Sequence, residues 1–346
     1  MRYRASYLLC KHLKMNHALI EILADGQFHS GEDMGARLGI SRAAIWKQLQ
    51  KLEAMNIPLH SVKGKGYRLP EAVELLVLEN LKKSGFPSEK FVSSSIELSL
   101  DSTNNKMMSV AKTNIHDRHI VFAEMQTAGR GRRGREWVSP FARNLYLSIL
   151  WPFSQGIAAI QGLSLAVGLA IQRSLKEQGV PNVGLKWPND ILVNGGGANG
   201  AKLGGILIEL TGDMSDACQV VVGVGLNLDI QAKDLTKIDQ QATGVKQLGK
   251  GISRNAMTAN IVKHLCEVLE QFSVQGFAPL QQEWNDSDAF KGQEVKLILP
   301  SSEIKGVCAG VNEKGELQLQ TAEGLKAFNA GEVSLRRIIE GDGSCV

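Results

Sequence analysis

The sequence is poor in cysteine and lacks any long apolar run. Its five cysteines, at positions 10, 218, 266, 308 and 345, are odd in number and show no C-x-x-C spacing. Cysteines scattered in this way suit a reducing compartment and argue against a zinc site. No apolar run approaches the length of a membrane span, and residues 7–10 are too few for a signal-peptide core. We therefore expect a cytoplasmic protein that does not bind a membrane.

Charge is distributed unevenly along the 346 residues. The net charge is only +4, yet residues 1–70 carry 11 Lys and Arg against 5 Asp and Glu, while the remainder carries 28 against 30. The basic end is therefore the candidate nucleic-acid contact. Four of its charges precede Met15 and are absent if translation begins there, so residues 1–14 are a possible N-terminal extension.

Residues 15–70 have the pattern of a winged helix-turn-helix. One apolar helix comes first, and Ser30 and Ser41 are placed as N-caps of two further helices. A basic glycine turn at 63–66 then joins two short strands, which would form the wing. The alternative is a helical protein-interaction module with a solvated basic face. The side chains expected to face DNA are Ser41, Arg42, Trp46, Lys47, Gln50, Lys63 and Lys65.

The next segment predicts a helical linker over 71–95 and a strand over 96–100. The strand runs into Asp101-Ser102-Thr103-Asn104, which has the composition of a helix start. The N-terminus of a helix leaves backbone amides free to meet a ligand. A plain N-cap is the other interpretation.

Residues 126–137 (QTAGRGRRGREW) alternate glycines with four arginines. Glycine at 129, 131 and 134 disfavours a helix, and arginine forks bind carboxylate and phosphate groups bidentately. Because apolar runs at 119–125 and 144–150 flank this stretch, we expect a loop between two strands. It could be a solvated basic turn, an RGG-like nucleic-acid segment, or a cradle for an anionic small molecule.

Two lysines stand at the ends of apolar strands farther on. Lys186 opens the run Lys186-Trp187-Pro188-Asn189-Asp190, which could serve phosphate, ribose or magnesium, or could simply form a turn. Lys202 heads a second apolar strand, where it either snorkels or meets an anion. Strands dominate this region, with one long helix at 162–178 between them, so α+β is favoured over a doubly wound sheet.

The last third of the chain predicts a helix and a small β domain. Residues 244–250 begin like a phosphate-binding G-x-x-x-x-G-K loop, but Gly251 stands where Ser or Thr is needed and no strand precedes, so we discount it. Ser253 caps a long amphipathic helix, and a shorter helix ends near Asp286. From Lys291 onward, short apolar strands alternate with glycine turns, which predicts a small β-barrel.

Together these motifs resemble the bifunctional biotin-protein ligase and biotin-operon repressor family. The resemblance is carried by residues 129–137, 186–190, 202–207 and 223–227, in that order. It implies a multidomain α+β fold, with a winged helix-turn-helix domain at 15–70, a linker at 71–95, a mixed α/β ligase domain like that of class II synthetases at 96–287, and an SH3-like domain at 288–346.

The resemblance also implies an activity and its partners. Biotin would be activated with ATP to biotinyl-5′-AMP and transferred to a lysine of the biotin carboxyl carrier protein of acetyl-CoA carboxylase. The adenylate-bound homodimer would act as transcriptional repressor at the operator DNA of the biotin biosynthesis operon, with biotinyl-5′-AMP as the corepressor. Two rivals stay open. A lipoate-type ligase or acyltransferase should lack the DNA-binding domain, and a biotin-sensing repressor without ligase activity should lack Lys202 and the arginine loop.

By the same resemblance, named residues acquire expected roles. Two anions about 4 Å apart repel by about 4 kcal/mol at an effective dielectric of about 20, so joining a carboxylate to a phosphate calls for cations, and no side-chain nucleophile is needed. The catalytic cations would be Lys202, Arg130 and Arg132. Biotin would be bound by Ser102, Thr103, Asn104, Gln126, Arg130, Gly131, Arg132, Lys202 and Gly205. The nucleotide would be bound by Arg132, Arg135, Lys186, Asn189, Asp190 and Asn227, with Asp190 also a candidate Mg²⁺ ligand.

Three features depart from the family pattern. Trp46 places an indole where a smaller polar side chain is expected on the recognition helix. Residues 229–243, expected to fold over adenine, show no clear match, and residues 195–200 suggest a lengthened hairpin.

Overall fold

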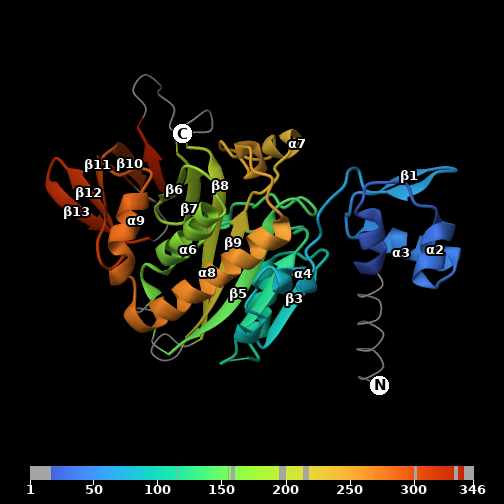
Figure 1. Cartoon of the computed structure of the whole chain (residues 1–346). Helices are drawn as coiled ribbons and strands as arrows, with labels where there is room; N and C mark the ends of the chain where they lie inside the picture. The colour runs from blue at the N-terminus through green and yellow to red at the C-terminus, as the bar shows by residue number, and fades with distance from the viewer. Residues whose placement is uncertain are drawn as a thin grey trace.

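The computed structural model describes residues 17–114, 116–154, 156, 160–194, 200–212, 218–299, 302–330 and 334–338. Along the chain these residues form a small helical unit, a large sheet covered by helices, and a second sheet near the C-terminus (Figure 1). The possible extension at 1–14 and the tip of the hairpin at 195–199 lie outside the described residues. No helix in the described part of the chain is long and apolar enough to span a membrane.

The first unit is the predicted winged helix-turn-helix. Residues 17–23 are helical, α2 spans Gly31–Leu38 and α3 spans Arg42–Ala54. The hydroxyls of Ser30 and Ser41 accept hydrogen bonds from the backbone N–H groups of Asp33 and Ala44, as expected of N-caps. The wing pairs β1 (His60–Val62) with β2 (Gly66–Arg68) in antiparallel register. All seven residues predicted to face DNA are exposed on this unit.

The central unit is a mixed sheet of seven strands within the described residues, in the order β3-β4-β5-β9-β8-β7-β6. Strands β3 and β4 are parallel and the other neighbours are antiparallel, which confirms α+β. The strands are β3 (Ser93–Glu97), β4 (His119–Ala123), β5 (Leu145–Phe153), β6 (Val183–Lys186), β7 (Asp190–Val193), β8 (Lys202–Gly212) and β9 (Cys218–Leu226).

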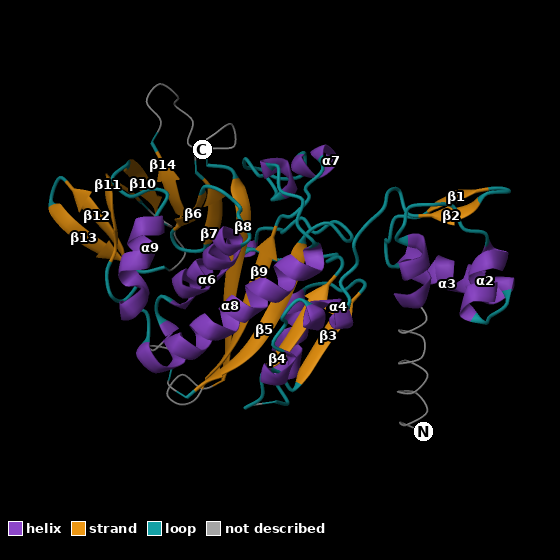
Figure 2. Ribbon diagram, in the orientation of Figure 1, coloured by secondary structure: helices purple, strands orange, loops and turns teal. Residues whose placement is uncertain are grey.

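Helices cover the two faces of this sheet unequally. Helices α6 (Leu163–Glu177) and α8 (Arg254–Gln275) lie across one face (Figure 2), where alternate residues of β5 and β9 join them in the main core. The shorter α5 (Thr103–Ala111) lies on the other face, against Val121, Leu150 and Val221. Because successive strand residues point to opposite faces, the same strands serve both layers.

The structure corrects two expectations about residues 71–100. The segment is helical only in α4 (Leu78–Lys83) and a short 3₁₀ turn, η1 (Ser88–Lys90), and β3 begins three residues earlier than the predicted strand. Gly85 has φ of 91° and ends the helix, after which Phe86 and Phe91 are buried in the main core. The strand was misplaced because Ser93–Ser95 carry no apolar signal, although they pair in register with β4.

The C-terminal unit is a five-stranded antiparallel sheet within the described residues, in the order β13-β12-β11-β10-β14. Helix α9 (Gln281–Ser287) precedes it. Trp187, in the turn between β6 and β7, donates from its indole nitrogen to the Gly315 carbonyl at 3.1 Å, which ties the two sheets together. The strands are β10 (Glu294–Ile298), β11 (Glu303–Val311), β12 (Leu317–Thr321), β13 (Gly324–Phe328) and β14 (Ser334–Arg337), of which the last two were not predicted.

Residues between β9 and α8 contain the short helix α7 (Ala232–Leu235) and a 3₁₀ turn, η5 (Lys246–Leu248). The turn falls inside the discounted G-x-x-x-x-G-K stretch, and a strand does not lead into it. Ser253 caps α8 by accepting from the Ala256 N–H, as predicted.

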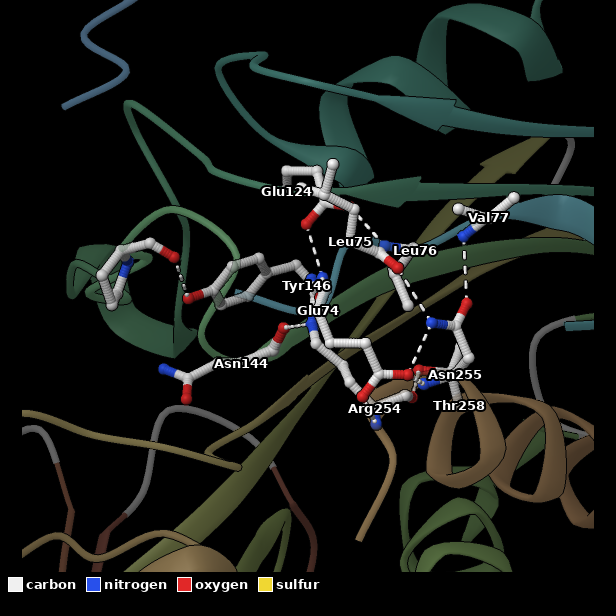
Figure 3. A network of polar contacts seen from close by, with 11 residues as sticks. Glu74, Leu75, Leu76, Val77, Glu124, Asn144, Tyr146, Arg254, Asn255 and Thr258 are labelled. Carbon is white, nitrogen blue, oxygen red and sulfur yellow. Dashed lines mark hydrogen bonds and ion pairs between the residues drawn. The ribbon is translucent and has the colours of Figure 1, made fainter. Parts of the chain in front are cut away.

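A buried polar network at the start of α8 fixes the segment that follows the first unit, at Glu74–Val77, to the central unit (Figure 3). Arg254 donates to Glu124 Oε2 at 2.5 Å and to the carbonyls of Glu74 and Asn144 at 3.1 and 3.0 Å. The Glu74 carboxylate accepts from the backbone N–H groups of Arg254 and Asn255. The side chains of Arg254 and Glu124 are only 5% and 1% exposed. Each would therefore be a buried, uncompensated charge without the other.

Replacing Arg254 with Met should lower the free energy of unfolding by about 3–5 kcal/mol, because the Glu124 carboxylate is then left buried without its partner. Chemical denaturation measures the loss. The matched control is Arg173→Met, which removes the more exposed Arg173–Glu283 pair and should cost less than about 1 kcal/mol. Equal losses in the two variants would contradict this account.

Candidate active site

A cavity of about 430 Å³ opens on the α5 face of the central sheet. Its walls come from the N-terminus of α5, the arginine loop, the turn between β6 and β7, and strands β8, β9 and β14. The structure brings to this cavity all of the residues predicted to bind biotin or nucleotide: Ser102, Thr103, Asn104, Gln126, Arg130, Gly131, Arg132, Arg135, Lys186, Asn189, Asp190, Lys202, Gly205 and Asn227.

Glycines create the floor of this cavity. Gly205 and Gly225 are paired neighbours on β8 and β9, and Gly223 follows on the same face. A Cβ atom at Gly223 would lie 2.1 Å from Asn104 Oδ1, and one at Gly225 would lie 2.5 Å from the Trp137 ring. Larger residues at these positions would displace the walls, so the depth of the cavity depends on them.

A chain of hydrogen bonds lines the end of the cavity beside α5. Gln126 Oε1 accepts from the Thr103 N–H at 2.8 Å, and Ser148 Oγ lies 2.6 Å from Asn104 Oδ1. Ser102 is the N-cap of α5, but its hydroxyl makes no capping bond. Ser102, Thr103 and Asn104 are nearly fully buried. This end therefore offers fixed amide and hydroxyl groups to a neutral polar ligand group.

The arginine loop folds back on itself over residues 129–137. Gly131 N–H donates to the Arg135 carbonyl, and Trp137 N–H donates to the Gly129 carbonyl, each at 2.8 Å. A Cβ at Gly129 would lie 2.4 Å from the Trp137 carbonyl oxygen, so glycine is required there. The loop thus has a defined backbone that aims its arginines at the cavity.

Two of these arginines already contact the walls. Arg130 pairs with Glu209 on β8 at 2.5 Å and donates to Asn105 on α5. Arg132 donates to Asn189 Oδ1 at 3.1 Å. Burial lowers the pKa of Arg132, and nearby Arg133 lowers it further, although Asp190 opposes the shift. A buried cation of this kind is stabilised by an anion.

A charged group lies at the end of the cavity away from α5. It consists of Lys186, Asp190 and Lys202. Lys202 Nζ lies 2.7 Å from one Asp190 oxygen, and Lys186 Nζ lies 3.9 Å from the other. Burial alone would raise the pKa of the Asp190 carboxyl, but Lys202 and Lys186 outweigh it and hold that pKa below its usual value. Burial lowers the pKa of Lys186 to about 8. Lys202 thus pairs with the Asp190 carboxylate rather than snorkelling. Its Nζ also lies 5.4 Å from the centre of the Trp137 ring.

The protein side chains at this end do not form a metal site by themselves. Among the described residues, no group of three or more His, Cys, Asp or Glu side chains could hold a metal ion. Both Asp190 oxygens face lysine ammonium groups. A magnesium ion at this place would need phosphate oxygens for most of its ligands.

Sequence reasoning missed the part of the cavity wall that comes from β14, although it did expect residues 229–243 to fold over adenine. Ser334, Leu335 and Arg336 reach it from β14 of the C-terminal unit, and residues 237–240 and 242 reach it from the segment after α7. The segment is held in place because Lys202 N–H donates to the Gln241 carbonyl and Thr243 N–H donates to the Lys202 carbonyl. No local pattern signals the contribution of β14, since it depends on how distant segments pack.

Comparison with known proteins places these features in a family. Three family profiles match the chain in order: HTH domain over residues 16–68, Biotin/lipoate A/B protein ligase family over 97–227, and Biotin protein ligase C terminal domain over 290–336. The Bifunctional ligase/repressor BirA of Escherichia coli (strain K12) is 39% identical over 323 residues, which are 92% of this chain and 96% of that relative.

Two further similarities cover the ligase part. The Biotin--[acetyl-CoA-carboxylase] ligase of Paracoccus denitrificans is 31% identical over 239 residues, 67% of this chain and 96% of that relative. The solved structure of the biotin protein ligase from Aquifex aeolicus in complex with biotin and ATP is 30% identical, with a TM-score of 0.60, and the similarity covers 72% of this chain and 100% of that one.

The two rival interpretations fail on their own criteria. A lipoate-type ligase should lack the DNA-binding unit, which is present, and a repressor without ligase activity should lack Lys202 and the arginine loop, which line the cavity. With about 40% identity over 92% of this chain and 96% of each of two such relatives, the chain belongs to the bifunctional ligase/repressor family of biotin protein ligases.

Proposed function

We propose that this chain joins biotin to ATP to make biotinyl-5′-AMP, and then transfers biotin to a lysine of a carrier protein. The observation that carries the proposal is the convergence of Arg130, Arg132, Lys186 and Lys202 on one glycine-floored cavity. Such a cavity can hold two anions side by side, which is the electrostatic requirement of the first step. The family relationship supports the same activity.

In the first step, a biotin carboxylate oxygen would attack the α-phosphorus of ATP. A C–O–P bond forms, the bond between the α-phosphorus and its bridging oxygen breaks, and pyrophosphate leaves. Lys202 and Arg132 would balance the charge on the reacting oxygens, while Ser102, Thr103, Asn104 and Gln126 would orient biotin. Lys186, Asn189, Arg135 and Asn227 would hold the nucleotide, with residues 237–242 beside it. In the second step, the carrier lysine attacks the carbonyl carbon and AMP leaves.

Several partners belong to this proposal. Mg²⁺ would be carried by the ATP phosphates, with Asp190 as a single protein ligand that must first release Lys202. The carrier would be the biotin carboxyl carrier protein of acetyl-CoA carboxylase. The adenylate-bound homodimer would bind operator DNA through α3 and the wing. The free cysteines at 218, 266 and 308 suit the cytoplasm as the place of action.

The test is ATP- and biotin-dependent labelling of a purified carrier domain, with pyrophosphate release measured in parallel. Lys202→Ala should reduce pyrophosphate release at least about a hundredfold, because removing one donor from a developing anion typically costs that much. Lys176→Ala, at an exposed position on α6, is the control and should stay at the wild-type rate. Wild-type release from folded Lys202→Ala would refute the assignment.

Affinity for ATP should fall as pH rises through about 8, because Lys186 loses its proton there in the free protein. Its pKa is depressed, so the cation is present below pH 8 and lost above it, while bound phosphate would raise the pKa again. We expect a decrease of about an order of magnitude between pH 7 and pH 9.5 by calorimetry. In Lys186→Arg, which stays charged, this decrease should disappear; an unchanged pH profile in that variant would exclude Lys186 as its source.

Biotinyl-5′-AMP should strengthen dimerisation. Four arginines in one short loop repel each other, and in our proposal this loop lies at the subunit contact, so an anion at the cavity that offsets the repulsion also favours association. One winged helix contacts only a half-site, so operator binding benefits from two copies at fixed spacing. Sedimentation with and without the adenylate measures the effect. Equal dimerisation constants in the two conditions would rule out this coupling even if ligation itself were confirmed.

A further inference from the structure

Arg143 lies between two carboxylates from distant parts of the chain. Its guanidinium pairs with Asp229 Oδ2 at 2.7 Å and with the Glu71 carboxylate on its other side, and its side chain is only 10% exposed. Nothing in the proposed reaction uses these three residues. The buried position of the guanidinium makes the bridge stronger than an ordinary surface pair.

Glu71 belongs to the exit of the winged-helix unit. It follows β2 and Pro70 directly, and two residues later the Val73 N–H donates to the Ala24 carbonyl at 2.8 Å. The flanking leucines Leu69 and Leu75 are buried in an apolar cluster that combines the core of that unit with Phe141 and Ala142, the two residues before Arg143. Glu71 therefore lies where the DNA-binding unit packs against the ligase core.

Asp229 lies just after β9, where the chain begins to form one wall of the cavity. It begins the segment that reaches the cavity at residues 237–240 and 242 and closes onto the backbone of Lys202. Lys246 and Gln247 also donate to its carboxylate, and its own N–H donates to Asn144 Oδ1 at 3.2 Å. Burial would raise the pKa of Asp229, but the hydrogen bonds from Lys246 and Arg143 lower it, so the carboxylate is charged.

We propose that Arg143 is a positioning residue that fixes the cavity wall at 229–243 to the exit of the DNA-binding unit, so that ATP affinity depends on Glu71. This inference rests on the proposed function, because it assigns that wall to the nucleotide. Glu71 and Asp229 share one guanidinium. Without it the two carboxylates would repel, and the wall would move away from the cavity.

The first experiment measures the ATP dissociation constant by calorimetry without biotin, and the biotin dissociation constant separately. Arg143→Met should weaken ATP about tenfold, the lower end of what losing a charged hydrogen bond costs, and leave biotin affinity within about twofold. Arg173→Met removes a more exposed Arg–Glu pair away from the cavity and should leave both constants unchanged. Unchanged ATP affinity in Arg143→Met, or an equal loss for biotin, overturns the proposal.

The second experiment separates the bridge from a merely structural role. Glu71→Gln should weaken ATP about threefold although Glu71 does not line the cavity, and it should have no further effect in the Arg143→Met background. Additive losses overturn the proposal. Asp229→Asn gives the same readout if Arg143→Met folds poorly. The proposed function fails separately if the wild-type protein makes no adenylate; if it makes adenylate and the variants bind ATP normally, only this inference fails.

Discussion

The alternation of side chains along β5, β9 and β8 is the constraint on which the site depends. One set of alternate residues packs under α6 and α8, and the other set faces α5 and the cavity. Gly205, Gly223, Gly225 and Ser148 all fall in the second set, because the register pairs Gly205 with Gly225 and Ser148 with Gly223. A shift of one residue would turn valines into the cavity and glycines into the core. The register that builds the core therefore also builds the cavity.

Charge at the cavity is balanced by protein groups before any ligand is considered. Lys202 has Asp190, and Arg130 has Glu209, so each cation is held in place by an anion of the wall. Burial nonetheless lowers the pKa of Lys186 and Arg132, although the carboxylate of Asp190 nearby opposes the shift. Cations that are buried and fixed in position are suited to stabilising charge that develops on a substrate. In the proposed reaction, this arrangement calls for no side-chain nucleophile.

Local patterns were sufficient to predict much of this structure and failed where packing between distant segments decides. The caps at Ser30, Ser41 and Ser253 and the glycine-arginine loop each follow from a few neighbouring residues. The start of β3 did not, because Ser93–Ser95 become a strand only by pairing with β4. Arg336 was missed for the same reason, since it reaches the cavity from a separate sheet. Likewise, the residues near Arg143 in the sequence do not predict that it pairs with Glu71 and Asp229.

The segment between the DNA-binding unit and the ligase core is built into the protein rather than being a free tether. Leu76 is buried in the main core, its N–H donates to Glu124, and Arg254 holds both Glu124 and the Glu74 backbone. Arg254 also donates to the carbonyl of Asn144, whose side chain accepts from the N–H groups of Leu228 and Asp229. The residues that fix the exit of the DNA-binding unit are therefore the ones that fix the start of the cavity wall. A displacement at either end must strain a buried polar network, and such networks are costly to leave partly satisfied.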